Sequence, residues 1–442
     1  MRFDEAVNYL LGLGHETLAI KLGLANIERL LAALGSPERA YPAVQIAGTN
    51  GKGSTAAMLD SICRAAGVRT GLYTSPHLVS ITERIRIAGR DITREDFPRL
   101  AAEVRAASTE LALASGALPT FFEQLTAIAL LAFRAAGVEL AILETGLGGR
   151  LDATTAARAD VVAITPIALD HQEYLGDTLR QIAAEKAAII RAGASAAVVA
   201  ASQPGEAREV IIARCRECRV TPRFATGDIR LLGADATGSM RVTFYTEADV
   251  YANVRLSLRG RHQATNAAVA VALAEVLRER GFPITRDRII EGLETARHAG
   301  RIELIAGNPP LLFDGAHNAA GARALREYLD EFAPAPVTLV FGAMRDKDLE
   351  EIAATLFPAS DNLILTRPNN PRAASPDALA RLGAAQGLDK PPLLVESAAD
   401  ALRAAEASTP PGGIICVTGS LYLVGEVKGF IAGRAEKLNP NA

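Results

Sequence analysis

The stretch "YPAVQIAGTNGKGSTAAMLDSICRAAG", residues 41–67, decides the fold. Its first seven residues are mostly apolar and typical of a buried strand, and residues 54–67 have the pattern of a helix that ends at a glycine. Between the two lies a glycine-rich loop with one lysine. Closely spaced glycines expose backbone N–H groups, and a helix N-terminus beside them attracts an anion. The sequence therefore predicts a phosphate-binding loop.

The spacing of this loop departs from the usual phosphate-loop pattern, G-x-x-x-x-G-K-[ST]. Only two residues separate Gly48 from Gly51, and Gly53 stands between Lys52 and Ser54. The alternative is a plain glycine-rich turn. The position between strand and helix and the charge of Lys52 favour a nucleoside triphosphate, and the hydroxyl of Ser54 or its neighbour suits Mg²⁺.

The bulk composition excludes several classes of protein. The chain has 442 residues, 49% of them hydrophobic, which allows two or three domains with a large core. A net charge of −3 and a pI near 6.2 give no broad basic surface, so we expect no nucleic-acid partner. No run of about 18 apolar residues occurs, so we expect no membrane span, and the N-terminus does not resemble a signal peptide.

The cysteines point to a reducing compartment. Only four occur, which is too few for a disulfide framework and suits the cytoplasm. Two of them, Cys215 and Cys218, form a lone C-x-x-C. Without a second pair or nearby histidines, we expect this motif to lie on a helix surface and to bind no zinc.

The order of the predicted elements indicates the fold class. Strand and helix patterns alternate along most of the chain, which predicts an α/β fold with a mostly parallel sheet. Residues 223–258 instead have the pattern of hairpins and predict a small antiparallel patch. Strand–helix pairs restart near residue 297 and repeat to the end. We therefore expect an N-terminal domain over residues 1–296 and a smaller, Rossmann-like domain over residues 297–442.

Polar side chains follow two predicted strands of the first domain. Glu144 ends the apolar strand 138–144 and precedes a glycine-rich loop, and His171 follows strand 161–165. Open α/β sheets bind ligands at the carboxyl ends of their strands. We assign Glu144 to Mg²⁺, in preference to a carboxylate that caps the loop amides. For His171, a metal or phosphate role and a purely structural role are equally compatible with the residues alone.

Two further segments are weaker signals. In "FDGAHNAAGARAL", residues 313–325, Asp314 ends a strand and suggests a ribose or other polar contact, while Asn318 is a natural helix N-cap. In "IAAEKAAII", residues 182–190, Glu185 and Lys186 interrupt an apolar helix. Taken alone, they indicate an exposed ion pair of little energetic value.

Together these motifs resemble one family. "GTNGKGST", "YTSPHL", "FFEQLT", "ETGLGGRLDAT", "DGAHN" and "VTGSLYLVGEV" are similar to motifs of folylpolyglutamate synthase/dihydrofolate synthase, which belongs to the Mur ligase superfamily. The resemblance extends from Leu22 to about Val427, with the motifs in the family's order. It implies a P-loop Mur-ligase-type ATPase domain followed by a Rossmann-like glutamate ligase domain.

The resemblance also implies the reaction. ATP would phosphorylate a substrate carboxylate, and the amine of L-glutamate would attack the acyl phosphate, with release of ADP and phosphate. The substrates would be dihydropteroate, which gives dihydrofolate, and reduced folates such as tetrahydrofolate polyglutamates. The alternative is a monofunctional folylpolyglutamate synthase. We expect a cytoplasmic monomer whose partners are these small molecules only.

Site residues follow from the same resemblance. The residues implied to contact ATP are Asn50, Gly51, Lys52, Gly53, Ser54, Asn266, Arg301 and Asp314. The residues implied at the chemistry are Lys52, Lys186, Arg301, which would act after the domains close, and His317, near the acyl phosphate. Two Mg²⁺ ions are implied, the first on Ser75 and Glu144 and the second on His171. A CO₂-derived carbamate on Lys186 would help to hold the second ion. This role replaces the interpretation of Lys186 as half of an exposed ion pair. Ser420 would lie beside the glutamate or in the region where the domains close.

The residues implied at the pterin end of the substrate are Lys21, Leu22, Phe121, Phe122, Glu123 and Thr154. An aromatic pair is able to stack on a flat ring, and its alternative role is core packing. Segment 21–35 resembles the segment that binds dihydropteroate in bifunctional members, and its "LGL", residues 22–24, favours that activity because members that only extend polyglutamate tend to lose it. This chain departs from the family pattern in a few places: Lys21 replaces Asp, Thr155 replaces Asn, Ala188 replaces Gly and Ala319 replaces Pro.

Two other functions remain as rivals. A cell-wall ligase that acts on a UDP-linked muramyl peptide is disfavoured by "TSPHL" and "FFEQLT". A P-loop NTPase switch or carrier needs neither a second nucleotide-contacting domain nor an amino-acid acceptor. ATP hydrolysis that is independent of glutamate would mark the second rival.

Overall fold

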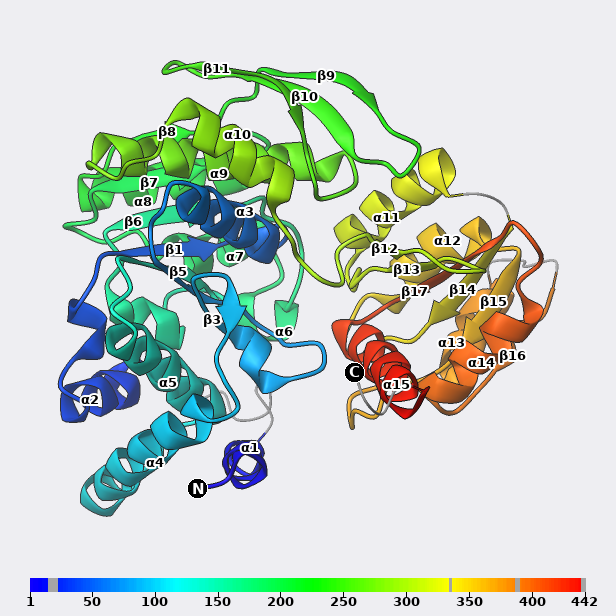
Figure 1. The fold of residues 1–442 in the computed structure, drawn as a ribbon, viewed down its shortest axis with the longest axis horizontal. Coiled ribbons are helices and arrows are strands. Elements are labelled where there is room, and N and C mark those ends of the chain that lie inside the picture. Colours follow the sequence, from blue (N-terminus) through cyan, green and yellow to red (C-terminus); the bar gives the residue numbers. More distant parts are fainter. Residues whose placement is uncertain (15–22, 334–335, 386–389, 439–442) are drawn as a thin grey trace.

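The structure is a computed structural model that describes residues 1–14, 23–333, 336–385 and 390–438. It contains two α/β units, each built around its own sheet (Figure 1). The strands of the first sheet are β1 (Ala43–Ala47), β2 (Thr70–Tyr73), β3 (Ile85–Ile87), β4 (Arg90–Asp91), β5 (Leu140–Glu144), β6 (Val161–Ile164), β7 (Ala196–Val199) and β8 (Pro222–Phe224). Their order is β4-β3-β2-β5-β1-β6-β7-β8, and from β2 to β8 all neighbours are parallel.

Helices cover both faces of this sheet (Figure 1). They are α1 (Phe3–Leu11), α2 (Ala25–Ala33), α3 (Lys52–Ala65), α4 (Asp96–Ser115), α5 (Phe121–Ala135), α6 (Gln172–Leu175), α7 (Leu179–Ala187), α8 (Gly205–Cys218), α9 (His262–Glu279) and α10 (Arg286–Thr295). Side chains of β1 alternate between the two layers: Ala43 and Ala47 pack with α5 and α7, whereas Val44 and Ile46 pack with α3 and α9. A parallel sheet buried on both faces requires such continuous apolar strands.

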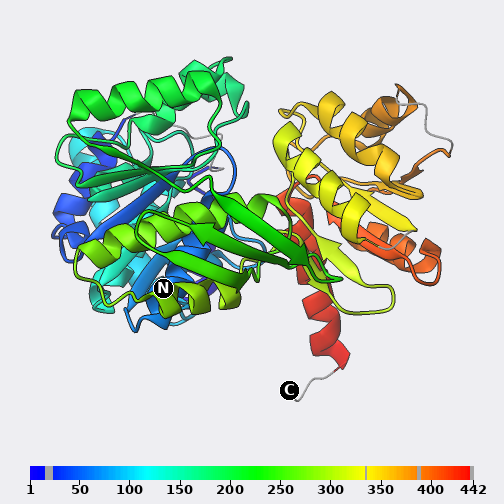
Figure 2. The same ribbon diagram turned by 90° about the horizontal axis from the view of Figure 1, so that it is seen from above.

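The predicted antiparallel patch is present. It consists of β9 (Ile229–Ala234), β10 (Met240–Tyr245) and β11 (Val250–Arg255), in the order β11-β10-β9. Figure 2 shows these strands extending toward the second unit. At their far end, the Tyr328 hydroxyl donates to the Thr237 carbonyl over 2.8 Å. The patch therefore contributes to the contact between the two units.

The second unit contains a six-stranded sheet, which confirms the predicted smaller α/β domain. Its strands are β12 (Glu303–Ile305), β13 (Leu311–Phe313), β14 (Val337–Phe341), β15 (Asn362–Leu365), β16 (Leu393–Leu394) and β17 (Ile414–Thr418), in the order β12-β13-β17-β14-β15-β16. Its helices are α11 (Ala319–Phe332), α12 (Leu349–Leu356), α13 (Pro376–Ala385), α14 (Ala398–Ser408) and α15 (Leu421–Leu438). The predicted domain division at residue 296/297 falls in the linker between α10 and β12.

Two details differ from the predictions. The phosphate-loop helix begins at Lys52 and not at Ser54, because Gly51 adopts a φ of 86° and ends the loop one residue before the lysine. Cys215 and Cys218 were expected on a helix surface, but both are buried in α8. Small thiols pack well against an apolar core, so the C-x-x-C motif has a packing role here. No helix among the described residues is long and apolar enough to cross a membrane.

Candidate active site

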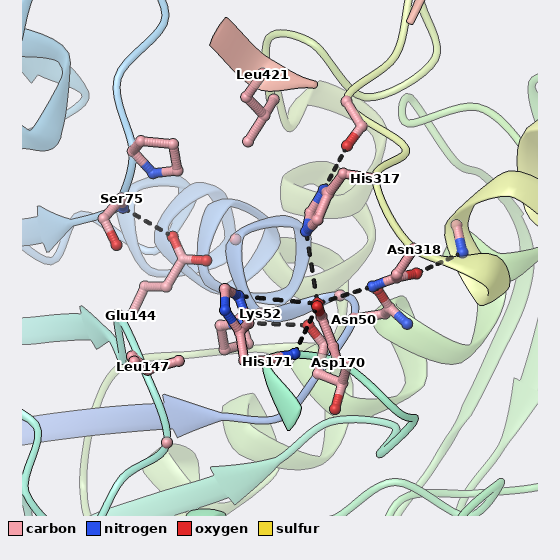
Figure 3. Close-up of a pocket in the computed structure, with 18 of the residues that line it drawn as sticks. Asn50, Lys52, Ser75, Glu144, Leu147, Asp170, His171, His317, Asn318 and Leu421 are labelled. Atoms are coloured by element: carbon pink, nitrogen blue, oxygen red, sulfur yellow. Dashed lines mark hydrogen bonds and ion pairs between the residues drawn. The ribbon is translucent and has the colours of Figure 1, made fainter. Parts of the chain in front are cut away.

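A cavity of about 560 Å³ lies between the two units. The loops after β1, β5 and β6 form its wall on the first unit, and the loops after β13, β14 and β17 form its wall on the second. All six strands contribute their carboxyl ends, which is where open α/β sheets bind ligands. The two sheets therefore share one site, shown in Figure 3.

The phosphate loop has a conformation that only glycine tolerates at two positions. A Cβ on Gly48 would lie 1.8 Å from Thr165 Oγ1, and one on Gly51 would lie 2.1 Å from Asn266 Oδ1. The loop is tied to the loop after β6, because the backbone N–H groups of Thr49 and Asn50 both donate to the Pro166 carbonyl. The sequence motif is thus a rigid turn that holds the N-terminus of α3 toward the cavity.

Lys52, the first residue of α3, lies on the cavity wall directly after this loop. Its ammonium donates to the carbonyls of Gly48 over 3.2 Å and Thr49 over 3.1 Å. Burial lowers the pKa of Lys52, and the nearby carboxylates of Glu144 and Asp170 partly oppose that shift. Two neutral carbonyls are weak partners for an ammonium, so the site is suited to a stronger anionic partner such as a phosphate.

Glu144, at the end of β5, and Ser75, after β2, meet on the same wall of the cavity as the phosphate loop (Figure 3). The Ser75 backbone N–H donates to Glu144 Oε2 over 3.2 Å, and the Glu144 side chain is buried. Burial raises the pKa of Glu144 because its desolvation outweighs the nearby positive charge of Lys52. A buried carboxylate whose charge is incompletely compensated favours the binding of a cation in the cavity.

Lys186, on α7, also reaches the cavity, which overturns its interpretation as part of an exposed ion pair. Its side chain is buried and its ammonium donates to the Gly48 carbonyl over 2.8 Å. Glu185 instead pairs with Arg150 over 2.9 Å. Burial, with Lys52 adding to it, lowers the pKa of Lys186 to about 7. This amine is therefore largely neutral, and nucleophilic, just above neutral pH.

The loop after β6 brings His171 and Asp170 to the same cavity. Burial lowers the pKa of His171 to about 3, so its imidazole is neutral and able to bind a metal ion. No three His, Cys, Asp or Glu side chains converge as a preformed metal centre within the described parts of the chain. Any ion held here would draw its other ligands from the substrate, from water or from a modified side chain.

The linker between the units, the loops after β13 and β17, and α9 contribute further residues to the cavity. Arg301 lines the cavity, as do Asn266, Asp314, His317 and Ser420. The Asp314 carboxylate accepts the backbone N–H of Ile302 over 2.9 Å and that of Ala316 over 2.8 Å. In this structure Asp314 therefore fixes the linker beside Arg301. Its predicted contact with ATP stays a prediction.

The predicted pterin-side residues divide into two groups. Phe122 and Glu123 line the cavity, and Glu123 Oε1 is buried with no hydrogen-bond partner among the described residues. Phe121 is 4% exposed and packs in the core. Thr154 is also away from the cavity wall and bonds to Gln45 and Asp152. Lys21 and Leu22 lie outside the described residues.

Three departures from the family pattern have local explanations. Thr155 receives a hydrogen bond from Gln45 and donates to the Gly149 carbonyl over 2.7 Å, so its hydroxyl is used within the chain. Ala188 is the C-cap of α7 with an ordinary φ of −63°. Ala319 begins α11, whose N-cap Asn318 accepts the Gly321 N–H over 2.8 Å. The turn after His317 is thus held without proline.

Sequence reasoning missed Lys347, in the loop between β14 and α12. Its ammonium lies 2.6 Å from Asp170 Oδ1, across the boundary between the units. Lys347 follows the buried strand β14, as His171 follows β6, and this signal was available in "VFGAMRDKD". Asp152 was missed as well: it lines the cavity and caps the loop after β5 by accepting the Leu147 N–H over 2.9 Å.

Known proteins match both units. The Mur ligase middle domain family matches residues 46–274, and the Mur ligase glutamate ligase domain family matches residues 300–421. A probable bifunctional folylpolyglutamate synthase/dihydropteroate synthase of Haloferax volcanii is 38% identical over 97% of this chain. The match covers 50% of that relative, so the chain spans about half of its length.

Solved structures share the whole fold. A Mycobacterium tuberculosis folylpolyglutamate synthase, complexed with ADP and AMPPCP, has a TM-score of 0.87 and 33% identity, with 99% of each chain covered. A bifunctional folylpolyglutamate synthase/dihydrofolate synthase with Mn, AMPPNP and L-glutamate bound has a TM-score of 0.83 and 29% identity, with 98% of each chain covered.

Proposed function

The chain belongs to the Mur ligase family, in its folylpolyglutamate synthase/dihydrofolate synthase group, since the dihydrofolate synthase/folylpolyglutamate synthase of Bacillus subtilis is 33% identical over 94% of it. From this we propose that it uses ATP to ligate L-glutamate to folates. One observation carries the proposal: a single cavity joins the phosphate loop, with Lys52, to the strand-end carboxylate Glu144 and to His317 and Ser420 of the glutamate ligase domain. An NTPase switch would need the phosphate loop but not the residues of the second domain.

The reaction follows from the chemistry of a carboxylate, which is a poor acyl donor at neutral pH. An oxygen of the substrate carboxylate attacks the γ-phosphorus of ATP, the bond to ADP breaks, and an acyl phosphate forms. The amine of L-glutamate then adds to the acyl carbon, and phosphate leaves as the amide forms. The protein supplies orientation and charge neutralisation. Lys52 and Arg301 would face the phosphates, and His317 and Ser420 the incoming amine.

Residues at two places fit a divalent cation. Ser75 and Glu144 would hold the first cation, because Mg²⁺ prefers oxygen ligands such as a carboxylate. The Glu144 carboxylate is also buried with too little positive charge nearby to compensate it, so a bound cation would stabilise its charged form. His171, with a carbamate on Lys186, would hold the second. When bound, such a cation neutralises charge on the transferred phosphate. The related bifunctional structure that holds Mn supports a divalent metal in this fold.

Carbamylation of Lys186 is the third element of the proposal and gives a testable prediction. Only the neutral amine attacks CO₂, forming the C–N bond and releasing a proton. Because burial lowers the pKa of Lys186 to about 7, the carbamylated fraction rises as pH rises through that value. With carbon-13 bicarbonate at pH 8, NMR should show a carbamate carbonyl signal in the wild-type protein and in Lys52→Met, but not in Lys186→Met.

The control, Lys52→Met, removes a second buried amine of the same cavity, so it distinguishes the two lysines. A wild-type spectrum without a carbamate signal at pH 8, or a signal that survives in Lys186→Met, would contradict the assignment.

The pterin ring is proposed to lie against Phe122, with Glu123 Oε1 as an acceptor for one of its N–H groups. Removing the ring in Phe122→Ala should raise the KM for dihydropteroate about tenfold, because an aromatic contact contributes roughly 0.5–1.5 kcal/mol beyond its buried area. The KM for ATP should stay unchanged. Steady-state rates measure both, and Phe121→Leu in the core is the control. An unaltered KM for dihydropteroate in Phe122→Ala would remove the pterin from this wall.

The activity itself is tested by phosphate release from Mg-ATP. Release that requires L-glutamate and occurs with both dihydropteroate and tetrahydrofolate identifies the bifunctional enzyme. Release with tetrahydrofolate alone identifies the monofunctional alternative. Release without L-glutamate favours the NTPase rival. All four cysteines are buried free thiols, which supports the proposed location in the cytoplasm.

A further inference from the structure

Asp170 is a meeting point of the two domains. It belongs to the loop after β6, and three side chains from the C-terminal domain converge on its carboxylate. Lys347 Nζ lies 2.6 Å from Oδ1, Asn318 Nδ2 lies 3.0 Å from Oδ2, and His317 Nε2 lies 3.6 Å from Oδ2. The Asp170 and Lys347 side chains are only 6% and 8% exposed, so water screens their attraction little.

The contacts around Asp170 continue into the phosphate loop. The Asn318 amide that donates to Asp170 also donates to Asn50 Oδ1 over 3.0 Å, as Figure 3 shows. Lys347 Nζ lies 3.5 Å from His171 Nε2. One carboxylate of the N-terminal domain thus joins the loop after β14, the N-cap of α11 and the phosphate loop.

We propose that the Asp170–Lys347 ion pair docks the C-terminal domain onto the phosphate loop, and that both residues are positioning residues for the ligation. Neither is assigned to the reacting atoms. Their role is to bring His317 and Asn318 against the phosphate-loop side of the cavity. This inference rests on the proposed function for its kinetic consequences, but the docking itself does not depend on which substrate is used.

The physical reason is the difference in solvation between docked and separated domains. When the domains are apart, water surrounds both charges. When they dock, each charge loses water and is compensated by the other. Removing one partner leaves the other buried and unpaired in the docked arrangement only. The change therefore shifts the equilibrium between domain arrangements and leaves each domain's own core intact.

A second ion pair between the domains provides a matched control. Arg261, at the start of α9, pairs with Glu331 on α11 over 2.6 Å, and these side chains are 46% and 37% exposed. An exposed pair contributes little, because water and salt screen it. Neither residue lines the cavity between the domains. Glu331→Gln therefore removes an ion pair between the domains without removing the buried one.

The experiment is a double-mutant cycle in the full-length protein with Lys347→Met, Asp170→Asn and the double variant, beside Glu331→Gln. Steady-state kinetics give kcat and KM for L-glutamate and ATP. Each single variant should lower kcat/KM for L-glutamate about 100-fold, and the double variant should be no worse than the more affected single variant. Glu331→Gln should stay within about threefold of wild type.

Small-angle scattering of the ligand-free protein provides the readout that is independent of activity. The radius of gyration should increase in Lys347→Met and Asp170→Asn and stay at the wild-type value in Glu331→Gln, with unchanged melting temperatures in all three. Two results would overturn the proposal: a loss of kcat/KM in the double variant that equals the product of the two single losses, or an unchanged radius of gyration in both Lys347→Met and Asp170→Asn. If the wild-type protein shows no L-glutamate-dependent turnover, the proposed function fails, while the scattering comparison still decides the docking.

Discussion

Lys52→Met is expected to reduce phosphate release from Mg-ATP at least about 1,000-fold with the fold intact. Methionine keeps most of the length of the side chain and removes its charge. The ammonium of Lys52 is the cation that the phosphate loop itself presents, and its partners within the loop are only two backbone carbonyls. Loss of one preorganised donor to a developing anion typically costs about 10²–10³ in rate, and a full charge costs more.

The control for this prediction is Arg64→Met, because Arg64 lies on the same helix and pairs with Asp60 over 2.7 Å, away from the cavity. That variant should keep near-wild-type turnover. Thermal unfolding should show that Lys52→Met is folded, since burial already disfavours its charge. A folded Lys52→Met enzyme with near-normal turnover would show that phosphate is not bound at this loop.

Glu144→Gln is the second change with a large expected effect. The variant keeps the shape of the side chain but loses the charge that would hold the first divalent cation beside Ser75. We expect turnover to fall by about 100- to 1,000-fold at low Mg²⁺, because a bound cation contributes several kcal/mol to stabilising the transferred phosphate. Excess Mg²⁺ should restore part of the rate, and titration of the rate against Mg²⁺ measures both effects.

A matched control for Glu144→Gln is Glu139→Gln just before the same strand, where the carboxylate accepts the Arg69 N–H over 2.8 Å on the exposed surface. Its Mg²⁺ dependence should equal that of the wild type. Because burial raises the pKa of Glu144, a neutral glutamine should leave the melting temperature unchanged or higher. An unaltered Mg²⁺ dependence in folded Glu144→Gln would remove the metal from this site.

The fold was predictable wherever local pattern and tertiary context agree. Strand, glycine loop and helix at residues 41–67 predicted the phosphate loop, because the only backbone that joins these elements here needs glycine at Gly48 and Gly51. The rule that ligands bind at strand ends found Glu144 and His171. The same rule applied to the loop after β14 would have found Lys347, whose role depends on a partner, Asp170, 177 residues away.

Other residues show where sequence alone is insufficient. Phe121 and Phe122 are adjacent and chemically identical, yet only Phe122 faces the cavity, because successive residues of α5 point in different directions. Lys186 looked like half of an exposed ion pair, since the pattern of α7 does not reveal that the phosphate loop packs against it. The role of Lys186 was predictable only from the resemblance of the chain to the folylpolyglutamate synthase/dihydrofolate synthase family.

Transfer of a heavy-oxygen label tests the central claim most directly. Dihydropteroate or tetrahydrofolate would carry oxygen-18 in the carboxylate that accepts glutamate, and the enzyme would turn over with Mg-ATP and L-glutamate. If the carboxylate is activated as an acyl phosphate, one labelled oxygen appears in each phosphate released, and mass spectrometry detects it together with the glutamylated product. Unlabelled phosphate would mean that water, and not the folate carboxylate, attacks ATP in this cavity, and would contradict the ligase assignment.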